Sequence, residues 1–211
     1  MATRILLIRH GQTEWNRQRI FRGRADIPLS EAGLQQAEAL ANRLAGEPVS
    51  AIYSSPLKRA YVTAEHLAAR CRAALRPVER FTDISYGEWE GQHYQQVERA
   101  YPELYAGWQT EPHLVRPPGG ETLAEVRQRA AAALDQVIAQ HPVCTVAVVS
   151  HRAVNKVLLS MALGLGDDGF WRIRQDTCCL NMLEWDGGRF AVCLLNDTCH
   201  LRGLESDAAD F

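Results

Sequence analysis

Near its N-terminus the chain reads Ile5-Leu6-Leu7-Ile8-Arg9-His10-Gly11-Gln12-Thr13-Glu14-Trp15-Asn16. Its four apolar residues run without a break and stop at the arginine, the histidine and the glycine. A short apolar run that ends beside glycine is typical of a buried parallel strand. The Arg-His pair would then lie at the carboxyl end of the strand, where open α/β sheets bind ligands. An arginine beside a histidine at this place favours an anion. The glycine that follows lets the backbone approach a ligand. Taken alone, it is equally consistent with a polar strand end in water.

The composition is that of an ordinary globular protein, and it excludes several classes of function. The chain has 211 residues, of which 46% are hydrophobic and 23% are charged, and this length can bury a substantial core. A formal net charge of -2 gives no general attraction for nucleic acid. The N-terminal apolar run is too short for a signal peptide, and no run approaches the ~18 residues that span a bilayer. We therefore expect a cytoplasmic protein without nucleic-acid or membrane partners.

Strand and helix patterns alternate along the chain. Strands are predicted at residues 5–8, 49–53, 74–78, 143–149, 180–185 and 190–195. Helices are predicted after the N-cap Ser30, from Pro56, after the capping box at Thr122, and over residues 154–163. This alternation predicts an α/β fold of three layers, in which helices cover both faces of a mostly parallel sheet. We expect residues 1–211 to form a single domain.

Residues 92–120 are the least regular part of the sequence, and they are rich in aromatic side chains and proline. Long segments of this kind in compact domains are typically lids or binding loops. We therefore expect a lid-like segment at about residues 92–120.

Three of the predicted strand ends carry positively charged or imidazole side chains. Arg9 and His10 follow the first strand, Arg59 lies shortly after the second, and His151 follows the strand at 143–149. Parallel strands place their carboxyl ends at one edge of the sheet, so these four side chains can meet there. Two guanidiniums and two imidazoles around one point favour a dianion, and phosphate is the obvious candidate.

Such a site can perform phosphoryl transfer. A neutral histidine nitrogen can attack phosphorus and form a phosphoenzyme, while the arginines and the second histidine hold the equatorial oxygens. A carboxyl group must then protonate the leaving alkoxide. Asp83, Glu88 and Glu90 are the candidates for this acid, and their spacing does not choose among them.

Other phosphate-binding and hydrolytic designs lack their motifs here. The sequence contains no H-x-x-x-H or H-E-x-x-H zinc motif, no P-loop and no Gly-x-Ser-x-Gly elbow, and its six cysteines show no metal-type spacing. We expect no metal site, no cofactor and reduced cysteines. A protein that only binds a phosphorylated metabolite remains an alternative, because the same residues would serve it. Turnover of an aryl phosphate with and without EDTA would distinguish the metal enzyme, the metal-free enzyme and the binding protein.

Several motifs spread over nearly the whole chain resemble the histidine phosphatase superfamily, also called the phosphoglycerate mutase-like family. They are Leu7-Ile8-Arg9-His10-Gly11-Gln12-Thr13-Glu14-Trp15-Asn16, Phe21-Arg22-Gly23-Arg24, Ser54-Ser55-Pro56-Leu57-Lys58-Arg59-Ala60, Tyr86-Gly87-Glu88-Trp89-Glu90-Gly91, Val149-Ser150-His151 and Asn196-Asp197-Thr198-Cys199-His200-Leu201. The resemblance implies a phosphoglycerate mutase-like fold. It also implies a nucleophilic histidine that becomes a phosphohistidine during turnover.

The resemblance assigns a role to each matching position. His10 would be the nucleophile, and Arg9, Arg59 and His151 would complete the phosphate pocket. Gly11, Asn16, Arg22 and Gly23 would border the substrate. The family's proton donor falls on Asp83, where many members carry glutamate, and Glu88 is the reserve. Position 152, usually small in the family, is Arg152 here, and it would either add a phosphate contact or point to solvent.

The resemblance favours hydrolysis over mutase activity. Cofactor-dependent mutases of the family carry the acid-loop sequence Asn-Glu-Arg-His-Tyr, whereas this chain has Thr82-Asp83-Ile84-Ser85-Tyr86. We expect a metal-independent phosphomonoesterase of the histidine acid phosphatase type that acts on a small phosphorylated metabolite. A phosphoglycerate mutase is the alternative. The C-terminal motifs are similar to those of metal-independent phosphoserine phosphatases, and family members often dimerise, so a homodimer is one expected assembly.

Overall fold

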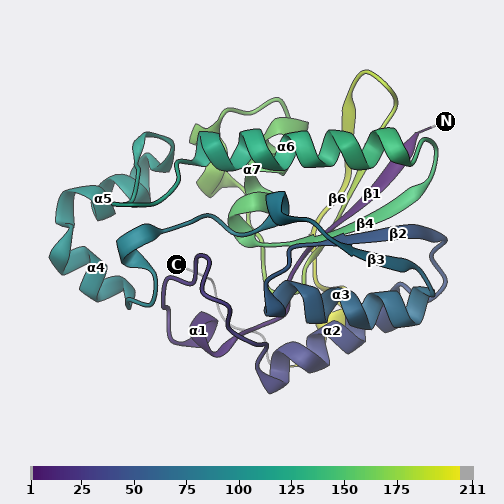
Figure 1. Cartoon of the computed structure of the whole chain (residues 1–211), viewed down its shortest axis with the longest axis horizontal. Helices are drawn as coiled ribbons and strands as arrows, with labels where there is room; N and C mark the ends of the chain where they lie inside the picture. Colours follow the sequence, from purple (N-terminus) through teal and green to yellow (C-terminus); the bar gives the residue numbers. More distant parts are fainter. Residues whose placement is uncertain (1, 205–211) are drawn as a thin grey trace.

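The computed structural model describes residues 2–204 of the chain, and the single domain expected over 1–211 includes positions outside this range. A six-stranded sheet has the order β3-β2-β4-β1-β5-β6. Strands β3, β2, β4 and β1 are parallel, β5 pairs antiparallel to β1, and β6 pairs antiparallel to β5 as the second strand of a hairpin (Figure 1). This is the α/β fold with a mostly parallel sheet that the sequence predicts. The strands are β1 (Thr3–Arg9), β2 (Val49–Ser54), β3 (Ala74–Pro77), β4 (Thr145–Ser150), β5 (Leu180–Trp185) and β6 (Phe190–Asp197).

Helices cover both faces of the sheet, as expected (Figure 1). Two of them, α2 (Glu31–Arg43) and α3 (Lys58–Cys71), lie on one face, and α6 (Leu123–Gln140) and α7 (Arg152–Ala162) lie on the other. The remaining helices are α1 (Glu14–Arg17), α4 (Tyr94–Ala100) and α5 (Pro102–Thr110), with short 3₁₀ turns η1 (Glu79–Phe81), η2 (Gly87–Trp89), η3 (Pro112–Leu114), η4 (Asp167–Arg172) and η5 (Cys199–Leu201).

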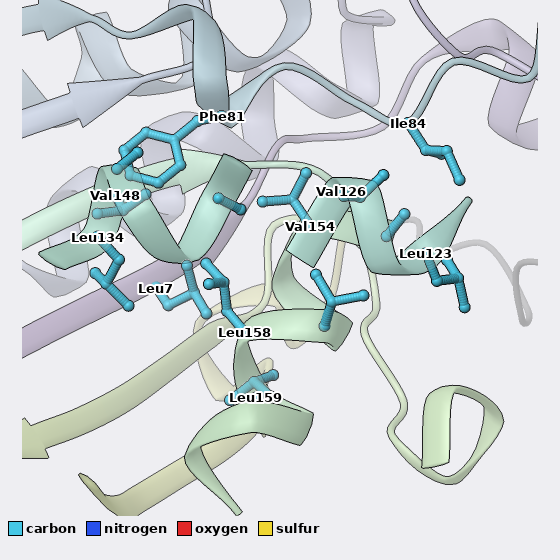
Figure 2. Packing of buried hydrophobic residues seen from close by; sticks show 14 of the residues in the cluster. Leu7, Phe81, Ile84, Leu123, Val126, Leu134, Val148, Val154, Leu158 and Leu159 are labelled. Carbon is cyan, nitrogen blue, oxygen red and sulfur yellow. The ribbon is translucent and has the colours of Figure 1, made fainter. Parts of the chain in front are cut away.

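Alternate residues of the central strands pack into two separate cores. In β1, Leu6 and Ile8 join the cluster beneath α2 and α3, whereas Ile5 and Leu7 join the cluster beneath α6 and α7, and all four are fully buried. Figure 2 shows Leu7 in this second cluster beside side chains of β4 and the two helices. A strand buried on both faces reads as a continuous apolar run, which explains the pattern at residues 5–8.

Two helix starts follow the predicted capping chemistry. The Ser30 hydroxyl accepts a hydrogen bond from the Gly33 amide at the start of α2. At the start of α6, Thr122 and Glu125 form a reciprocal capping box. Each cap satisfies N–H groups that have no partner within the helix, so these starts are encoded locally.

The predicted start of α3 at Pro56 is wrong, because the helix begins at Lys58. Ser55 does not cap it: its hydroxyl accepts from the Leu57 amide and lies 2.8 Å from His151 Nε2. The Lys58 amide donates instead to the Asp26 carboxylate at 2.7 Å, so a residue from a distant loop supplies the missing acceptor. A long-range contact therefore sets this helix start.

The description of residues 92–120 as the least regular part is also wrong, because the segment contains α4, α5 and η3. These helices extend beyond one end of the sheet (Figure 1). The Trp89 and Trp108 side chains are fully buried there, with ring centroids 6.3 Å apart in an edge-to-face arrangement. Aromatic packing of this kind orders a segment whose sequence shows no clear helical period.

Smaller differences concern the β4 boundary and the cysteines. Strand β4 begins at Thr145 rather than Val143, because Val143 has a left-handed φ of 60° and is 51% exposed. All six cysteines are free, as expected, although Cys193 and Cys199 are exposed rather than packed as small hydrophobic residues. Within residues 2–204, no helix has the length and apolar character needed to cross a membrane.

Candidate active site

The carboxyl ends of three neighbouring strands bring the predicted site residues together. Strand β1 ends at Arg9, which stands in register with Ser150 of β4, and Ser54 of β2 stands in register with Val149 of β4. The residues that follow these ends, His10 and His151, have ring centroids 5.1 Å apart. The sheet topology thus creates the convergence that the sequence predicts.

Hydrogen bonding assigns the tautomer of His10. Its Nδ1 lies 2.6 Å from the Gly11 carbonyl oxygen, which can only accept, so Nδ1 carries the proton and Nε2 keeps its lone pair. The ring is 1% exposed. Burial lowers the pKa of His10 well below its ordinary value, and the charges of Arg59, Arg9 and Arg22 lower it further. A buried imidazole with a free Nε2 lone pair at neutral pH is a suitable nucleophile.

Arg9 and Arg59 are buried and held by main-chain carbonyl oxygens. Arg9 Nη1 donates to the Gln175 carbonyl at 2.6 Å, and Arg59 donates to the carbonyls of Ala25 and Gly23, each at 2.7 Å. Burial lowers the pKa of Arg59, and the charge of Asp83 opposes this effect. Guanidiniums fixed in this way form a rigid positive environment that favours an anion.

The structure places Asp83 with this cluster and Glu88 away from it. Asp83 is 5% exposed, and its Oδ2 lies 3.2 Å from Arg59 Nη2 and 3.6 Å from His151 Nδ1. Glu88 is exposed, and its carboxylate accepts a 2.6 Å hydrogen bond from the Tyr101 hydroxyl. Glu90, the third candidate acid, accepts from the Tyr86 and Arg24 amides.

His151 is fully buried at the start of α7, where it is the N-cap residue. Burial lowers its pKa well below the ordinary value, and the charge of Arg59 and the neighbouring His10 add to this effect. Its Nε2 lies 2.8 Å from the Ser55 hydroxyl. Both histidines are therefore neutral in the free protein at pH 7, and the positive charge of the site comes from the arginines.

The residues expected to border the substrate have different surroundings. Gly11 packs so closely against Gly33 that an added Cβ would lie 2.6 Å from the Gly33 carbonyl oxygen. Gly23 has a left-handed φ of 50° and presents its carbonyl to Arg59. Asn16 is buried in α1, where its side-chain oxygen accepts from the amide and hydroxyl of Thr13.

Two arginines near the site are more buried than their sequence context suggests. Arg22 is 6% exposed and is close enough to lower the pKa of both His10 and His151, although burial is the larger cause in each case. Arg152 is also 6% exposed. The suggestion that Arg152 points to solvent is therefore wrong, and its guanidinium lies over the Trp171 ring at 5.5 Å.

Sequence reasoning missed several residues that support the site. Ser55 follows β2, so the strand-end criterion that identified His151 could have found it. Arg129 donates to the carbonyls of Arg80, Thr82 and Asp83 and pairs with Glu121. Arg129 lies beside the buried face of α6, and a charged residue at such a position indicates a structural contact of this kind. Gln175, whose carbonyl holds Arg9, lies in a segment without a periodic pattern, so no local signal marks it.

The donor sets needed for a metal ion are not assembled in the described part of the chain. Among residues 2–204, no group of three or more histidine, cysteine, aspartate or glutamate side chains is arranged to hold a metal ion.

Comparison with known proteins gives one family and a set of similar phosphatases. The model of the histidine phosphatase superfamily (branch 1) matches residues 5–198. Phosphoserine phosphatase 1 of Hydrogenobacter thermophilus is 36% identical over 198 residues, which cover 94% of each chain. Among solved structures, YhfR of Bacillus stearothermophilus has a TM-score of 0.91 and 33% identity, covering 95% of this chain and 100% of that one. Mycobacterial glucosyl-3-phosphoglycerate phosphatase Rv2419c has a TM-score of 0.87 and 26% identity, covering 94% and 100%.

Proposed function

The chain belongs to branch 1 of the histidine phosphatase superfamily, and on that premise we propose that it hydrolyses phosphomonoesters of small metabolites through a phosphohistidine on His10. The observation that carries this proposal is the 2.6 Å hydrogen bond from His10 Nδ1 to the Gly11 carbonyl. It directs the lone pair of Nε2 away from the backbone, in a ring surrounded by buried guanidiniums. The nucleophile and Arg9 thus come from the end of β1, and Arg59 and His151 come from the segments that follow β2 and β4.

In the first half-reaction, His10 Nε2 attacks phosphorus and a P–N bond forms as the P–O bond to the leaving alcohol breaks. Arg9 and Arg59 stabilise the charge on the equatorial oxygens, with His151 beside them. Asp83 donates its proton to the leaving oxygen.

In the second half-reaction, water attacks the phosphohistidine. Asp83, now ionised, accepts a proton from the water as the new P–O bond forms and the P–N bond breaks. Inorganic phosphate leaves, and His10 and Asp83 return to their starting protonation states. The chemistry requires no metal ion, because the arginines neutralise the transferred group.

Substrates of the compared proteins support the substrate class. Phosphoserine phosphatase 1 and glucosyl-3-phosphoglycerate phosphatase are named for small phosphorylated metabolites. We propose a substrate of this size and kind for the present chain. A panel of phosphomonoesters ranked by kcat/KM, each measured with and without EDTA, would identify the preferred alcohol and test metal independence.

Trapping the intermediate tests the mechanism directly. Rapid acid-free quenching of a reaction with radiolabelled substrate should leave an acid-labile, base-stable phosphate on His10. The variant His10→Asn should give no labelled protein and at least about 10⁴-fold lower kcat. His66→Asn, at a half-buried position of α3 where the imidazole contacts Glu38 of α2, is the matched control. Turnover by wild-type protein without label on His10 would contradict the proposal.

Product analysis distinguishes hydrolase, mutase and binding protein. We expect 3-phosphoglycerate, supplied with catalytic bisphosphoglycerate, to yield inorganic phosphate rather than 2-phosphoglycerate. Formation of 2-phosphoglycerate would assign mutase activity. Binding of phosphomonoesters without any turnover would identify a binding protein.

A further inference from the structure

A cavity of about 260 Å³ lies beside the first two turns of α7. Arg152 and Lys156 form its wall on the helix, and residues 173–176 with Trp171 form the rest. The two cationic residues are four positions apart, so they lie on the same side of α7. Neither is exposed to bulk solvent: Arg152 is 6% and Lys156 is 4% exposed.

Aromatic rings hold both charges in place. Lys156 Nζ lies 4.3 Å from the centroid of the Trp171 ring and 4.6 Å from that of Phe170, and Arg152 Cζ lies 5.5 Å from the Trp171 centroid. Cation–π contacts of this kind attract a positive charge to the face of a ring, and they are stronger where the charge is buried.

The cavity has a net positive lining. Arg152, Lys156 and Arg174 face a single lining carboxylate, that of Asp176. Asp176 Oδ1 accepts from Arg174 Nε and Oδ2 accepts from Asn196 Nδ2, both at 2.8 Å, so the charges of Asp176 and Arg174 offset each other and the net positive charge of the lining comes from Arg152 and Lys156. The α7 wall therefore gives the cavity a potential that favours an anion.

Two connections place this cavity next to the phosphate pocket. Gln175 lines the cavity, and its carbonyl oxygen accepts the 2.6 Å hydrogen bond from Arg9 Nη1. Arg152 directly follows His151 in the chain and hydrogen-bonds Tyr86. Burial raises the pKa of Tyr86, and the charge of Asp83 raises it as well, so Tyr86 lies near both residues. The lining of the cavity is thus joined to the phosphate pocket at two points, by the Gln175–Arg9 hydrogen bond and by the chain between Arg152 and His151.

We propose that this cavity binds a carboxylate of the substrate, with Lys156 and Arg152 as its ligands, while the phosphoryl group lies at His10. The inference rests on the proposed function and adds that the preferred substrate is a phosphorylated hydroxy acid. A guanidinium and an ammonium on one helix side can contact both oxygens of a carboxylate. The site would therefore select for the non-phosphorylated end of the substrate.

Two substrates that differ only in the carboxylate test this inference. O-phosphoserine and O-phosphoethanolamine share the phosphoryl group and the amine, and only the first has the carboxylate. We expect the wild-type protein to prefer phosphoserine in kcat/KM. In Lys156→Met, which keeps the aliphatic contacts with the rings, the ratio of the two kcat/KM values should fall roughly tenfold or more, as loss of a charge-assisted hydrogen bond implies. Arg152→Gln should shift the ratio in the same direction.

A surface charge near the cavity supplies the matched control. Arg127 lies on α6, is 40% exposed and pairs with Asp167 of η4, so Arg127→Gln removes one positive charge without touching the cavity. This variant should keep the wild-type ratio. If the ratio of the two kcat/KM values stays at the wild-type value in Lys156→Met and Arg152→Gln, the inference is overturned and the proposed hydrolysis is left intact. An equal loss of kcat/KM on both substrates is one form of this outcome.

Two further outcomes are distinguishable. A larger effect of Lys156→Met on propane-1,3-diol bisphosphate than on phosphoserine would assign the cavity to a second phosphoryl group and overturn the carboxylate assignment. Failure of the wild-type protein to hydrolyse either amino-alcohol phosphate or the aryl phosphate would overturn the proposed function, and the inference with it.

Discussion

The phosphate pocket and the α7 cavity both bury cationic side chains, but the groups around these side chains differ. In the pocket, Arg9 and Arg59 donate to main-chain carbonyl oxygens at 2.6 to 2.7 Å. In the cavity, Arg152 and Lys156 lie over aromatic rings at 4.3 to 5.5 Å. Carbonyl oxygens accept directed hydrogen bonds from a guanidinium, whereas ring faces attract a positive charge through their quadrupole, and Arg152 also hydrogen-bonds Tyr86.

The difference matches what each region must do. A phosphoryl-transfer site needs its charges in place before the reaction, because reorganisation at the transition state costs rate. A site that recognises the other end of the substrate acts instead on the discrimination among substrates. We therefore expect changes in the pocket to affect kcat on every substrate, and changes in the cavity to affect the choice among substrates.

The largest effect within this comparison should come from Asp83→Asn. Loss of the proton donor should lower kcat on an alkyl phosphate by about 10²–10⁴-fold, because the alkoxide leaves unprotonated. The loss should be smaller on p-nitrophenyl phosphate, whose phenolate needs little protonation. Glu88→Gln is the control, since Glu88 is exposed and bound to Tyr101, and it should change kcat by less than about twofold. The reverse ranking of the two variants would assign the donor to Glu88.

A second prediction uses the buried histidines, which belong to the pocket and not to the lining of the cavity. Burial lowers the pKa values of His10 and His151 well below 6.5. Below about pH 6.5 the unfolded chain therefore binds protons at these histidines that the folded chain does not bind. Their contribution to the free energy of unfolding is fully present above this pH and falls as the pH decreases. Each histidine lowers the free energy of unfolding by at most about 1.4 kcal/mol for each pH unit below this value.

Urea unfolding of wild-type protein and His10→Asn between pH 7.5 and 5 measures this contribution. The variant should lose less stability over this range than the wild type, because His10 is one of the histidines whose pKa is lowered by burial, with His151 and His200. The other histidines and the carboxylates titrate in both proteins and cancel in the difference. Parallel pH dependences would show that His10 titrates normally in the folded protein.

The smallest expected effect concerns Arg129, which fixes the backbone that carries Asp83. Its guanidinium donates to the carbonyls of Arg80, Thr82 and Asp83 at 2.6 to 2.9 Å. Lysine cannot reach all three, so Arg129→Lys should lower kcat on alkyl phosphates about tenfold. The loss should again be smaller on p-nitrophenyl phosphate, as for Asp83→Asn. Arg127→Lys, two residues earlier and exposed, is the control, and equal losses on both leaving groups would reduce Arg129 to a structural role.

Much of the fold and the core of the site could be predicted from local patterns. The apolar run at residues 5–8 identified a strand buried on both faces, and the capping residues Ser30 and Thr122 marked true helix starts. His10 and His151 were found because parallel strands bring their carboxyl ends to one edge. These signals work because they depend on neighbouring residues and on a topology that strand–helix alternation already implies.

The sequence by itself therefore determined the sheet, its helical layers and the strand ends that carry charge. Only the tertiary structure decided the start of α3, the helices within residues 92–120, the separation of Asp83 from Glu88, and the burial of Arg152 and Lys156. In each of these cases the deciding contact joins residues far apart in the chain. A hydrogen-bond acceptor, an aromatic ring or a guanidinium from a distant segment can fix the position of a residue. Such a partner produces no periodic pattern in the sequence around that residue.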